Sequence, residues 1–314
     1  MNISGVNATT AGKYNEQLAA FDGFCLEKGI QLEFRTTVDD DLLLQYLQSL
    51  RGEKEESGEY VPSAPWKVLS AMKARSPGSL YPWSEKFLRD WAKAHEPFTT
   101  EAYPLTLLQA KAVIVQFLLG EEYERAICAL LQWLGWLRVN EALKVKNEDL
   151  FLAEDGSTML RLKGTKTRLI DIVKLGKGPM VQLLWSLIET VRSRKKTRYN
   201  SKSYITGLTL GKYVQGLETA FTKLEIRDVR YANTEWQAAK LTSHSFRRGA
   251  ATHHHSVLGW NIIQLKQHGR WKSTESLERY LAGSLALIST PRFPDEIAWL
   301  GRKFEDYAGG KITL

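Results

Sequence analysis

Residues 241–280 read LTSHSFRRGAATHHHSVLGWNIIQLKQHGRWKSTESLERY. In this stretch His244 and Arg247 are one helical turn apart, and Trp271 precedes Tyr280 by nine residues. Two cationic side chains at this spacing can hold one phosphate, and a tyrosine phenol can attack a phosphorus atom. The pattern therefore predicts a site at which a tyrosine attacks a phosphodiester.

The composition is that of a folded protein with a basic C-terminal part. The chain has 314 residues, 43% of them hydrophobic, and a formal net charge of +8. Residues 1–100 contain 11 Lys and Arg against 14 Asp and Glu, whereas the remainder contains 32 against 21. Such a basic surface attracts polyanions, nucleic acid among them. The sequence has no apolar run of about 20 residues and no secretory signal, which predicts a soluble intracellular protein that does not enter a membrane.

Helical periodicity dominates the first hundred residues. We expect helices over 14–28, 40–50, 66–75 and 82–95, with no strand before residue 150. Residues 96–106, EPFTTEAYPLT, contain two prolines and no periodicity, and we expect them to form a linker. The sequence therefore predicts an all-helical domain over residues 1–100 and a second domain over 101–314.

The second domain combines helices with a short β segment. Helices are expected over 107–120, 123–136, 138–145, 179–195, 210–224 and around the opening stretch. Residues 158–173, TMLRLKGTKTRLIDIV, form two β-rich runs around a tight turn at 164–166. The predicted fold class is mainly α with a small β-sheet. Cys25 and Cys128 lack metal-ligand spacing and are expected to be buried free thiols.

Arg138 is the first candidate to hold a phosphate. It lies in GWLRVNEAL, and its guanidinium could donate to two phosphate oxygens at once. Glu141 follows three residues later, so the two side chains can pair on one helix face. The alternative is a surface Arg–Glu pair without a catalytic role.

His244 and Arg247 form the second candidate pair. Thr242 and Ser243 are suitable N-caps, so both side chains would project from the first turn of a helix, where backbone N–H groups favour an anion. His244 could move protons while Arg247 holds phosphate, and Arg248 would point to the DNA backbone or to solvent. The alternative is a helix start with a solvated arginine pair.

Three further residues complete the candidate set, each with a structural alternative. Lys166 would lie at the hairpin tip and protonate a leaving oxygen, although Lys163 and Arg168 flank it. The Trp271 indole could line one side of the site and donate its N–H to phosphate, or it could belong to the core. Tyr280 would end a helix over 274–281 with Leu277 and Leu281 facing the core, and its phenol needs cationic neighbours to react at neutral pH.

Other polar residues have weaker interpretations. His268 is a rival for the proton or phosphate role. Residues 253–255 are three consecutive histidines, which point about 100° apart on a helix and cannot together bind one metal ion. Residues 192–198, RSRKKTR, could contact DNA, end a solvated helix or act as a nuclear localisation signal. No metal or cofactor is predicted.

The order Arg, Lys, His-x-x-Arg, Trp, Tyr resembles the tyrosine recombinase/integrase family over residues 105–285. GWLRVNEAL is similar to the first arginine box, GTKT to the hairpin lysine, HSFRR to the second box and GRWKSTESLERY to the last box. Trp271 in place of a histidine is similar to the Cre-like members. The HSFRRGAAT segment also resembles recombinases of eukaryotic DIRS- and Crypton-type mobile elements.

This resemblance implies a chemistry without metal or ATP. Tyr280 would form a 3′-phosphotyrosyl bond, Arg138 and Arg247 would stabilise the phosphorane, and Lys166 would protonate the departing 5′-oxygen. His244 would assist proton transfer at the tyrosine, and Trp271 would support the phosphate. The partner would be double-stranded DNA, bound by a monomer that assembles into a tetramer and exchanges strands through a Holliday junction. Further residues expected to contact DNA are Arg248, Lys163, Arg168, Arg270, Lys272, Lys73 and Arg75.

The resemblance also assigns roles to both ends of the chain. Residues 1–100 would be a helical, core-binding DNA clamp domain, although they are net acidic, and we expect the basic residues between 67 and 93 to share one face. The tail from about residue 284 includes a predicted helix over 295–303. It would dock on a neighbouring protomer, or alternatively pack on its own domain.

Other readings of the same residues remain open. A type IB topoisomerase would use the same chemistry to relax DNA without exchange. A DNA-binding protein of recombinase descent would bind without cutting. A telomere resolvase would form hairpin ends, but the chain is short for that class. The protein would act in the bacterial cytoplasm or nucleoid, or in a eukaryotic nucleus.

Overall fold

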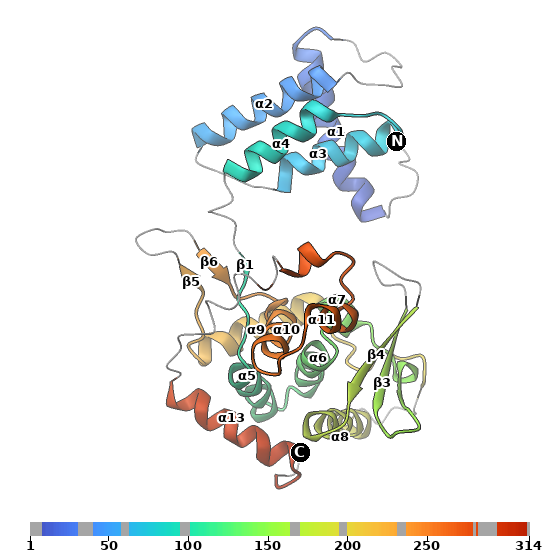
Figure 1. Cartoon of the computed structure of the whole chain (residues 1–314), viewed down its shortest axis with the longest axis vertical. Coiled ribbons are helices and arrows are strands. Elements are labelled where there is room, and N and C mark those ends of the chain that lie inside the picture. The colour runs from blue at the N-terminus through green and yellow to red at the C-terminus, as the bar shows by residue number, and fades with distance from the viewer. Residues whose placement is uncertain are drawn as a thin grey trace. The chain divides into compact units, whose positions relative to one another are not determined.

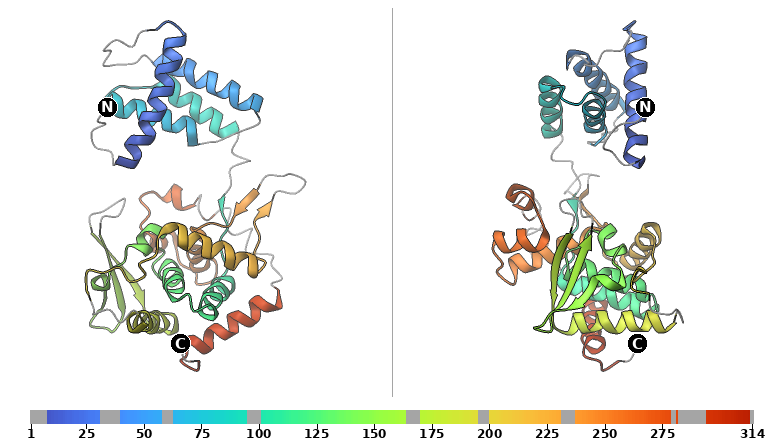
Figure 2. Two further views of the ribbon diagram at one scale, coloured as in Figure 1. Left: turned by 180° about the vertical axis from the view of Figure 1, so that it is seen from behind. Right: turned by 90° about the vertical axis from the view of Figure 1, so that its right-hand side faces the viewer.

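The chain folds into two compact units, Met1–Thr99 and Thr100–Leu314, here called the N-terminal and C-terminal units (Figures 1 and 2). The computed structural model describes residues 8–30, 40–57, 63–94, 101–163, 170–194, 200–230, 237–278, 281 and 294–312. Lys166, Arg168 and Tyr280 lie outside these residues, as do the predicted turn at 164–166 and residues 282–293. Within the described residues the fold is mainly α with small β-sheets, as predicted.

The N-terminal unit contains the four predicted helices. They are α1 (Ala8–Glu27), α2 (Asp40–Ser57), α3 (Ser63–Arg75) and α4 (Pro82–Ala94). Their apolar faces form one core in which Phe21, Leu47 and Trp91 are buried. Asp40 accepts hydrogen bonds from the backbone N–H groups of Trp83 at 2.6 Å and Ser84 at 3.0 Å. A carboxylate from the start of α2 thus caps α4 and ties the two helices together.

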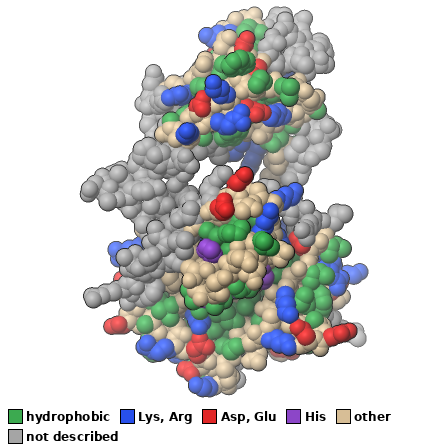
Figure 3. Space-filling view, in the orientation of Figure 1, with side chains coloured by type: hydrophobic (Ala, Val, Ile, Leu, Met, Phe, Trp, Pro, Cys, Tyr) green, Lys and Arg blue, Asp and Glu red, His purple; other side chains and the backbone are tan. Residues whose placement is uncertain are grey.

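Three basic residues of α3 and α4 lie within ion-pair distance of carboxylates. Lys73 forms an ion pair with Glu85, and Arg89 lies 3.8 Å from the same carboxylate. Arg75 donates to Asp22 of α1 at 2.5 Å. Lys and Arg side chains are accordingly interspersed with Asp and Glu on the face of this unit seen in Figure 3. The positive charge predicted for this surface is therefore partly neutralised.

The C-terminal unit is a helical cluster with two small sheets. Its helices are α5 (Leu107–Leu119), α6 (Tyr123–Leu134), α7 (Val139–Leu143), α8 (Pro179–Arg194), α9 (Leu210–Lys223), α10 (Ser245–Ser256), α11 (Ile262–Gly269) and α13 (Asp295–Ala308), with a 3-10 turn η2 (Asn147–Asp149). Its strands are β1 (Glu101–Ala102), β2 (Leu150–Leu152), β3 (Thr158–Lys163), β4 (Ile170–Gly176), β5 (Val229–Arg230) and β6 (Gln237–Lys240). Among the described helices, none is both long and apolar enough to cross a bilayer.

The larger sheet contains the two strands that the sequence predicts, β3 and β4, together with β2, which it did not predict. Its strand order is β2–β3–β4, and β3 and β4 pair antiparallel from Lys163 opposite Ile170 to Thr158 opposite Gly176. One face alternates buried residues, Leu160 and Leu162 on β3 and Val173 on β4, and packs on the helical core. Figure 2 shows this sheet at one side of the helices.

The second sheet was missed by the sequence analysis, and it corrects the linker prediction. β1 lies within the stretch 96–106 and pairs in parallel with β6, which also pairs with β5. Tyr103 and Leu105 follow β1 and are buried in the core. Tyr103 N–H donates to the Lys240 carbonyl at 2.7 Å, and Leu105 N–H donates to the Ser245 carbonyl at 3.3 Å. Residues 101–105 therefore belong to the C-terminal unit, because backbone pairing outweighs their loop-like composition.

Helix α10 runs through the centre of this unit, with every residue from Ser245 to Thr252 buried. Its start differs from the prediction, since His244 rather than Thr242 or Ser243 is the N-cap. The Thr242 hydroxyl instead accepts the His244 N–H at 3.1 Å, and the Ser245 hydroxyl accepts the Thr242 N–H at 3.0 Å. Gly249 allows α10 to touch the chain after β1, because a Cβ there would lie 2.0 Å from the Leu105 carbonyl oxygen.

The last helix, α13, packs on its own unit, which was the alternative to docking on a neighbour. Ile297, Leu300 and Phe304 are buried in the same core as α5. Gly301 faces Leu108, where a Cβ would come within 2.2 Å of the Leu108 side chain. Lys111 of α5 forms an ion pair with Glu305. The helix is also longer than the predicted 295–303, because its apolar face continues to Ala308.

Candidate active site

The loop between α6 and α7 places Arg138 at the start of α7. Glu141 accepts the Arg138 backbone N–H at 2.9 Å through Oε2 and the Arg138 Nη1 at 2.8 Å through Oε1. The predicted Arg–Glu pair is therefore present, and it joins a side-chain contact to a helix cap. The Arg138 side chain remains 32% exposed, whereas the Glu141 side chain is 13% exposed. Glu141 thus holds Arg138 at its backbone N–H and at its guanidinium, while the side chain stays partly exposed.

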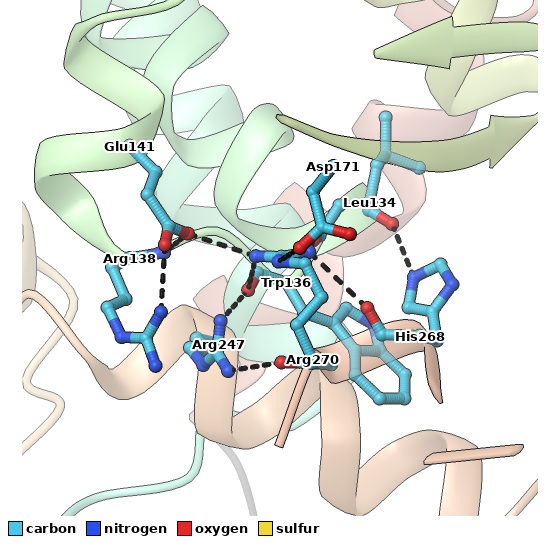
Figure 4. A network of polar contacts seen from close by, with 10 residues as sticks. Leu134, Trp136, Arg138, Glu141, Asp171, Arg247, His268 and Arg270 are labelled. Atoms are coloured by element: carbon cyan, nitrogen blue, oxygen red, sulfur yellow. Dashed lines mark hydrogen bonds and ion pairs between the residues drawn. The ribbon is translucent and has the colours of Figure 1, made fainter. Parts of the chain in front are cut away.

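Trp136, two residues before Arg138, turns its backbone carbonyl toward two other arginines. It is fully buried and has a φ of 45°, a left-handed conformation that is uncommon for a bulky residue. Its carbonyl oxygen accepts hydrogen bonds from Arg247 Nη1 and from Arg270 Nη2, the latter at 3.3 Å. The loop therefore gathers guanidinium groups from two distant segments around one peptide group (Figure 4).

Arg247 is buried beside this carbonyl, with 3% of its surface exposed. Its Nη2 donates to the Gly269 carbonyl at 2.6 Å, and its guanidinium lies 4.6 Å from the centre of the Trp271 ring. A cation over an indole face at this distance is attractive. Gly269 is necessary here, because a Cβ would lie 1.5 Å from the Trp271 ring. The second box and the Trp box thus meet through direct contacts.

His244 is exposed at the start of α10, on the lining of the same cavity as Arg138. Desolvation by its surroundings lowers the pKa of the imidazole, and the positive charges of Arg247 and Arg138 lower it further. The Glu141 carboxylate opposes this effect. The imidazole is therefore neutral at pH 7 and able to accept a proton.

Two residues predicted to contact DNA, Arg270 and Arg248, are buried in the protein. The Arg270 side chain is 5% exposed and donates to Glu141 Oε2 at 2.9 Å and to the Gly135 carbonyl at 3.1 Å. Its hydrogen bonds are made to groups inside the protein. Arg248 is also buried, with 4% exposure, because α10 is surrounded by protein on all sides at this turn. Lys272, in contrast, is exposed.

The histidines serve packing. The His268 ring packs edge-on against the Trp136 ring, with ring centroids 4.5 Å apart. Its Nε2 also lies 3.3 Å from the Leu134 carbonyl oxygen. Burial lowers its pKa to about 4, so it stays neutral and is a poor proton carrier near pH 7. His254 packs edge-on against Trp136 at 4.9 Å and lies 6.4 Å from the His268 ring. The described residues include no group of three His, Cys, Asp or Glu side chains suited to a metal ion.

A cavity of about 470 Å³ opens beside Arg138 and His244, and most of its charges are basic. Its basic residues are Arg138, Lys144, Lys146, Arg161 and Lys163. Lys163 is paired with Glu148 at 2.8 Å and Asp149 at 3.4 Å, and these carboxylates raise the pKa of its ammonium. The sequence analysis missed Lys144, Lys146 and Arg161, because single basic residues on a short helix or strand carry no distinctive spacing.

The structure thus brings together four of the six predicted catalytic residues, Arg138, His244, Arg247 and Trp271, from three distant segments. The other two, Lys166 and Tyr280, lie outside the described residues. Residues 274–278 are helical, and Leu277 and Leu281 on either side of Tyr280 are buried, as predicted. The sequence analysis did not identify Trp136 or Asp171, which contacts Arg270 at 4.0 Å.

Comparison with solved structures gives the fold. XerH site-specific recombinase bound to difH substrate, in a pre-cleavage complex, has a TM-score of 0.57 at 14% identity, with 89% of this chain and 79% of that chain covered. The XerH post-cleavage complex on palindromic difH has a TM-score of 0.58 at 13% identity, covering 87% and 76%. The Tn1549 transposon integrase, in complex with transposon right end DNA, has a TM-score of 0.53 at 13% identity, covering 96% and 95%.

This chain has the tyrosine recombinase fold. No protein-family model matches the sequence, and no curated protein matches it either. The recombinase fold explains why four candidates converge although they are up to 133 residues apart: α7, α10 and the turn after α11 all meet at the Trp136 loop.

Proposed function

We propose that this protein is a site-specific DNA recombinase that cuts and rejoins duplex DNA through a tyrosine. The observation that carries the proposal is the convergence of Arg138, His244, Arg247 and Trp271 on one side of the Trp136 loop. Each of these residues has a common structural explanation alone, but a core has no need of two arginines and an exposed histidine at one place. The fold shared with XerH and the Tn1549 integrase adds independent support.

In the proposed reaction the Tyr280 oxygen attacks phosphorus and the bond to the 5′-oxygen breaks. The phenol proton passes to neutral His244, and Lys166 supplies a proton to the departing 5′-oxygen. Arg138 and Arg247 stabilise the added negative charge, and Trp271 supports the phosphate. Rejoining reverses these transfers, so the phosphotyrosyl bond conserves the energy and neither ATP nor metal is consumed.

Arg138 would meet the phosphate first, because its side chain is 32% exposed whereas Arg247 is buried. The proposal therefore requires DNA binding to open a path to the Arg247 guanidinium. The basic cavity next to Arg138 would hold the DNA backbone through Lys144, Lys146 and Arg161. Lys163 and Lys272 would contribute at its margin, with Arg168 from the predicted hairpin.

The N-terminal unit would be a DNA clamp that contributes modest electrostatic attraction. Lys73 and Arg75 each have a carboxylate partner, so a DNA phosphate must compete with Glu85 or Asp22 for them. We propose a monomer in the absence of DNA and a tetramer on two DNA sites, exchanging strands in two steps through a Holliday junction. The protein would then act wherever the cell keeps its DNA.

The test is capture of a covalent adduct. Purified protein is incubated with nicked duplexes that carry a randomised window around the nick, then denatured, and DNA that remains attached to protein is sequenced. We expect wild type to enrich defined sequences joined through their 3′-phosphate. Tyr280→Phe should yield no adduct, because it removes the attacking oxygen. An adduct that persists in this variant would refute the assignment of the nucleophile.

Arg138→Ala and Arg247→Ala should each reduce the rate of adduct formation by roughly 100-fold or more, equivalent to about 3 kcal/mol of lost transition-state stabilisation. Arg302→Ala is the matched control, since Arg302 is exposed on α13. An equal loss in all three variants would indicate a general electrostatic effect.

The same preparation separates the rival enzyme classes. Supercoiled plasmid without the enriched sequence should remain supercoiled, and two plasmids that carry it should recombine. Relaxation of any plasmid without exchange would favour a type IB topoisomerase. Retention of DNA with no adduct in wild type would favour a binding protein that does not cut.

A further inference from the structure

Arg270 lies at the centre of the candidate site without reaching its surface. It follows α11 with a φ of 60°, the left-handed conformation that usually favours glycine or asparagine. This backbone conformation directs its side chain inward, where 5% of it is exposed. The Arg270 guanidinium therefore lies inside the protein, although the resemblance implies that this residue contacts DNA.

The contacts of Arg270 join the parts of the site that carry the candidate catalytic residues. Its Nη2 donates to Glu141 Oε2 at 2.9 Å, and Glu141 Oε1 accepts Arg138 Nη1 at 2.8 Å. The same Nη2 donates to the Trp136 carbonyl, which also accepts Arg247 Nη1. Its Nε lies 4.0 Å from Asp171 Oδ2 on β4, the second strand of the predicted hairpin (Figure 4).

We propose that Arg270 is a positioning residue that fixes Arg138 through Glu141 and Arg247 through the Trp136 carbonyl. This inference rests on the proposed function for its consequence in catalysis, but its structural part can be measured without DNA. Arg270 touches no reacting atom in this arrangement. Its effect is to set where two cations stand before a phosphate arrives, which is the condition for efficient electrostatic catalysis.

The geometry requires an arginine. The fork spans the Glu141 carboxylate and the carbonyls of Gly135 and Trp136, which a single ammonium cannot do at the same time. A lysine could keep the charge beside Glu141 but would leave at least one carbonyl without this donor. A substitution that keeps charge can therefore be distinguished from one that removes it.

The electrostatics give this arrangement a measurable signature at Glu141. Burial alone would raise the pKa of this carboxyl, but the charge of Arg270 and the hydrogen bonds and charge of Arg138 outweigh it and lower the pKa. Two further titratable groups of the described residues lie near this pair: His244, at the start of α10, whose pKa is lowered, and Asp171, 4.0 Å from Arg270 Nε. Arg270 therefore keeps Glu141 ionised, and ionised Glu141 holds Arg138.

The experiment follows the Glu141 carboxyl by carbon NMR during a pH titration of full-length protein, with Glu141→Gln to assign the signal. In Arg270→Met the titration midpoint should move upward relative to wild type, because the largest favourable charge is gone. Arg302→Met, which removes an exposed charge, should leave the midpoint in place. An unchanged midpoint in Arg270→Met would overturn the proposal.

The second readout is adduct formation on the DNA captured by wild type. Arg270→Met should react about 10- to 100-fold more slowly, the usual cost of losing a residue that orients a contacting group. The ratio of its rate to the wild-type rate should fall further at acidic pH, where Glu141 becomes protonated more readily in the variant. Protonation of His244 affects both proteins alike, so this extra loss should be absent when both carry Glu141→Gln. A slow rate with a wild-type pH profile would indicate only general destabilisation and would overturn the positioning role.

Arg270→Lys is a second variant that can be measured even if Arg270→Met does not fold. The midpoint of the Glu141 titration should stay near the wild-type value, because a lysine keeps the positive charge. Adduct formation should become slower, because the lysine lacks the forked guanidinium. Adduct formation at the wild-type rate in Arg270→Lys would overturn the proposal. If wild type forms no adduct, the proposed function fails, whereas the titration of Glu141 still decides whether Arg270 controls this carboxylate.

Discussion

Glu141→Gln should destabilise the C-terminal unit far more than a surface substitution of the same chemistry. The Glu141 side chain is 13% exposed and accepts three hydrogen bonds from Arg138 and Arg270, at 2.8 to 2.9 Å. A glutamine keeps one acceptor oxygen but turns an amide N–H₂ toward a guanidinium. Among the described residues, Arg270 would then keep Asp171, 4.0 Å away, as its nearby opposite charge. Breaking a buried ion pair in this way costs about 3–5 kcal/mol.

The matched control is Glu305→Gln. Glu305 pairs with Lys111 but its side chain is 55% exposed, so its loss should cost less than about 1 kcal/mol. Urea unfolding followed by tryptophan fluorescence suits the comparison, because seven of the ten tryptophans lie in residues 100–314. For a unit of this size, about 3 kcal/mol corresponds to a fall in Tm of about 6–12 °C.

The loss of stability in Glu141→Gln should depend on pH in a defined direction. The pKa of Glu141 is lowered in the folded protein, so its contribution is present above the pKa of an unfolded glutamate and is lost as the pH falls through the folded-state pKa. The difference in free energy of unfolding between wild type and Glu141→Gln should therefore become smaller at acidic pH. Equal stabilities of the Glu141 and Glu305 variants at pH 7 would refute the reasoning.

Two further predictions concern the packing around Trp136 and Arg247. Gly269→Ala would place a methyl group 1.5 Å from the Trp271 ring, so the ring must move off Arg247; we expect a loss of about 1–3 kcal/mol in urea unfolding, and an unchanged midpoint would contradict the packing described. The pKa of His268 is lowered from 6.5 to about 4, so the unfolded chain gains a proton before the folded protein does, and up to about 3 kcal/mol of stability should disappear between pH 6.5 and 4. His268→Phe should flatten that part of the stability–pH curve, and an identical curve would show that His268 titrates normally.

The helices of this protein could be predicted from the sequence because their apolar spacing is regular. Residues 107–119 and 123–134 are helical within two residues of the expected ends, and the β3–β4 pair lies on both sides of the expected turn. The sheet β1–β6–β5 could not be predicted, since β1 is two residues long and its partner is more than 130 residues away. Pairing at that separation depends on tertiary contacts that local composition does not encode.

The candidate site was predictable where its residues follow a spacing. Arg138 with Glu141 and His244 with Arg247 were found in this way, and they lie together. The burial of Arg270 could not be predicted, because it depends on a left-handed backbone conformation at φ 60° that turns its side chain inward. The role of the Trp136 carbonyl was out of reach, since a peptide group has no signature in the sequence.

The attachment of β1 has a practical consequence for dissecting the protein. A fragment that began at Leu107, the first residue of α5, would lose the strand that pairs with β6 and the buried side chains of Tyr103 and Leu105. It would leave Gly249 beside an empty groove and the edge of β6 open to other chains. A fragment that begins upstream of Glu101 keeps the pairing of β1 with β6. Such a fragment should therefore aggregate far less than one that begins at Leu107.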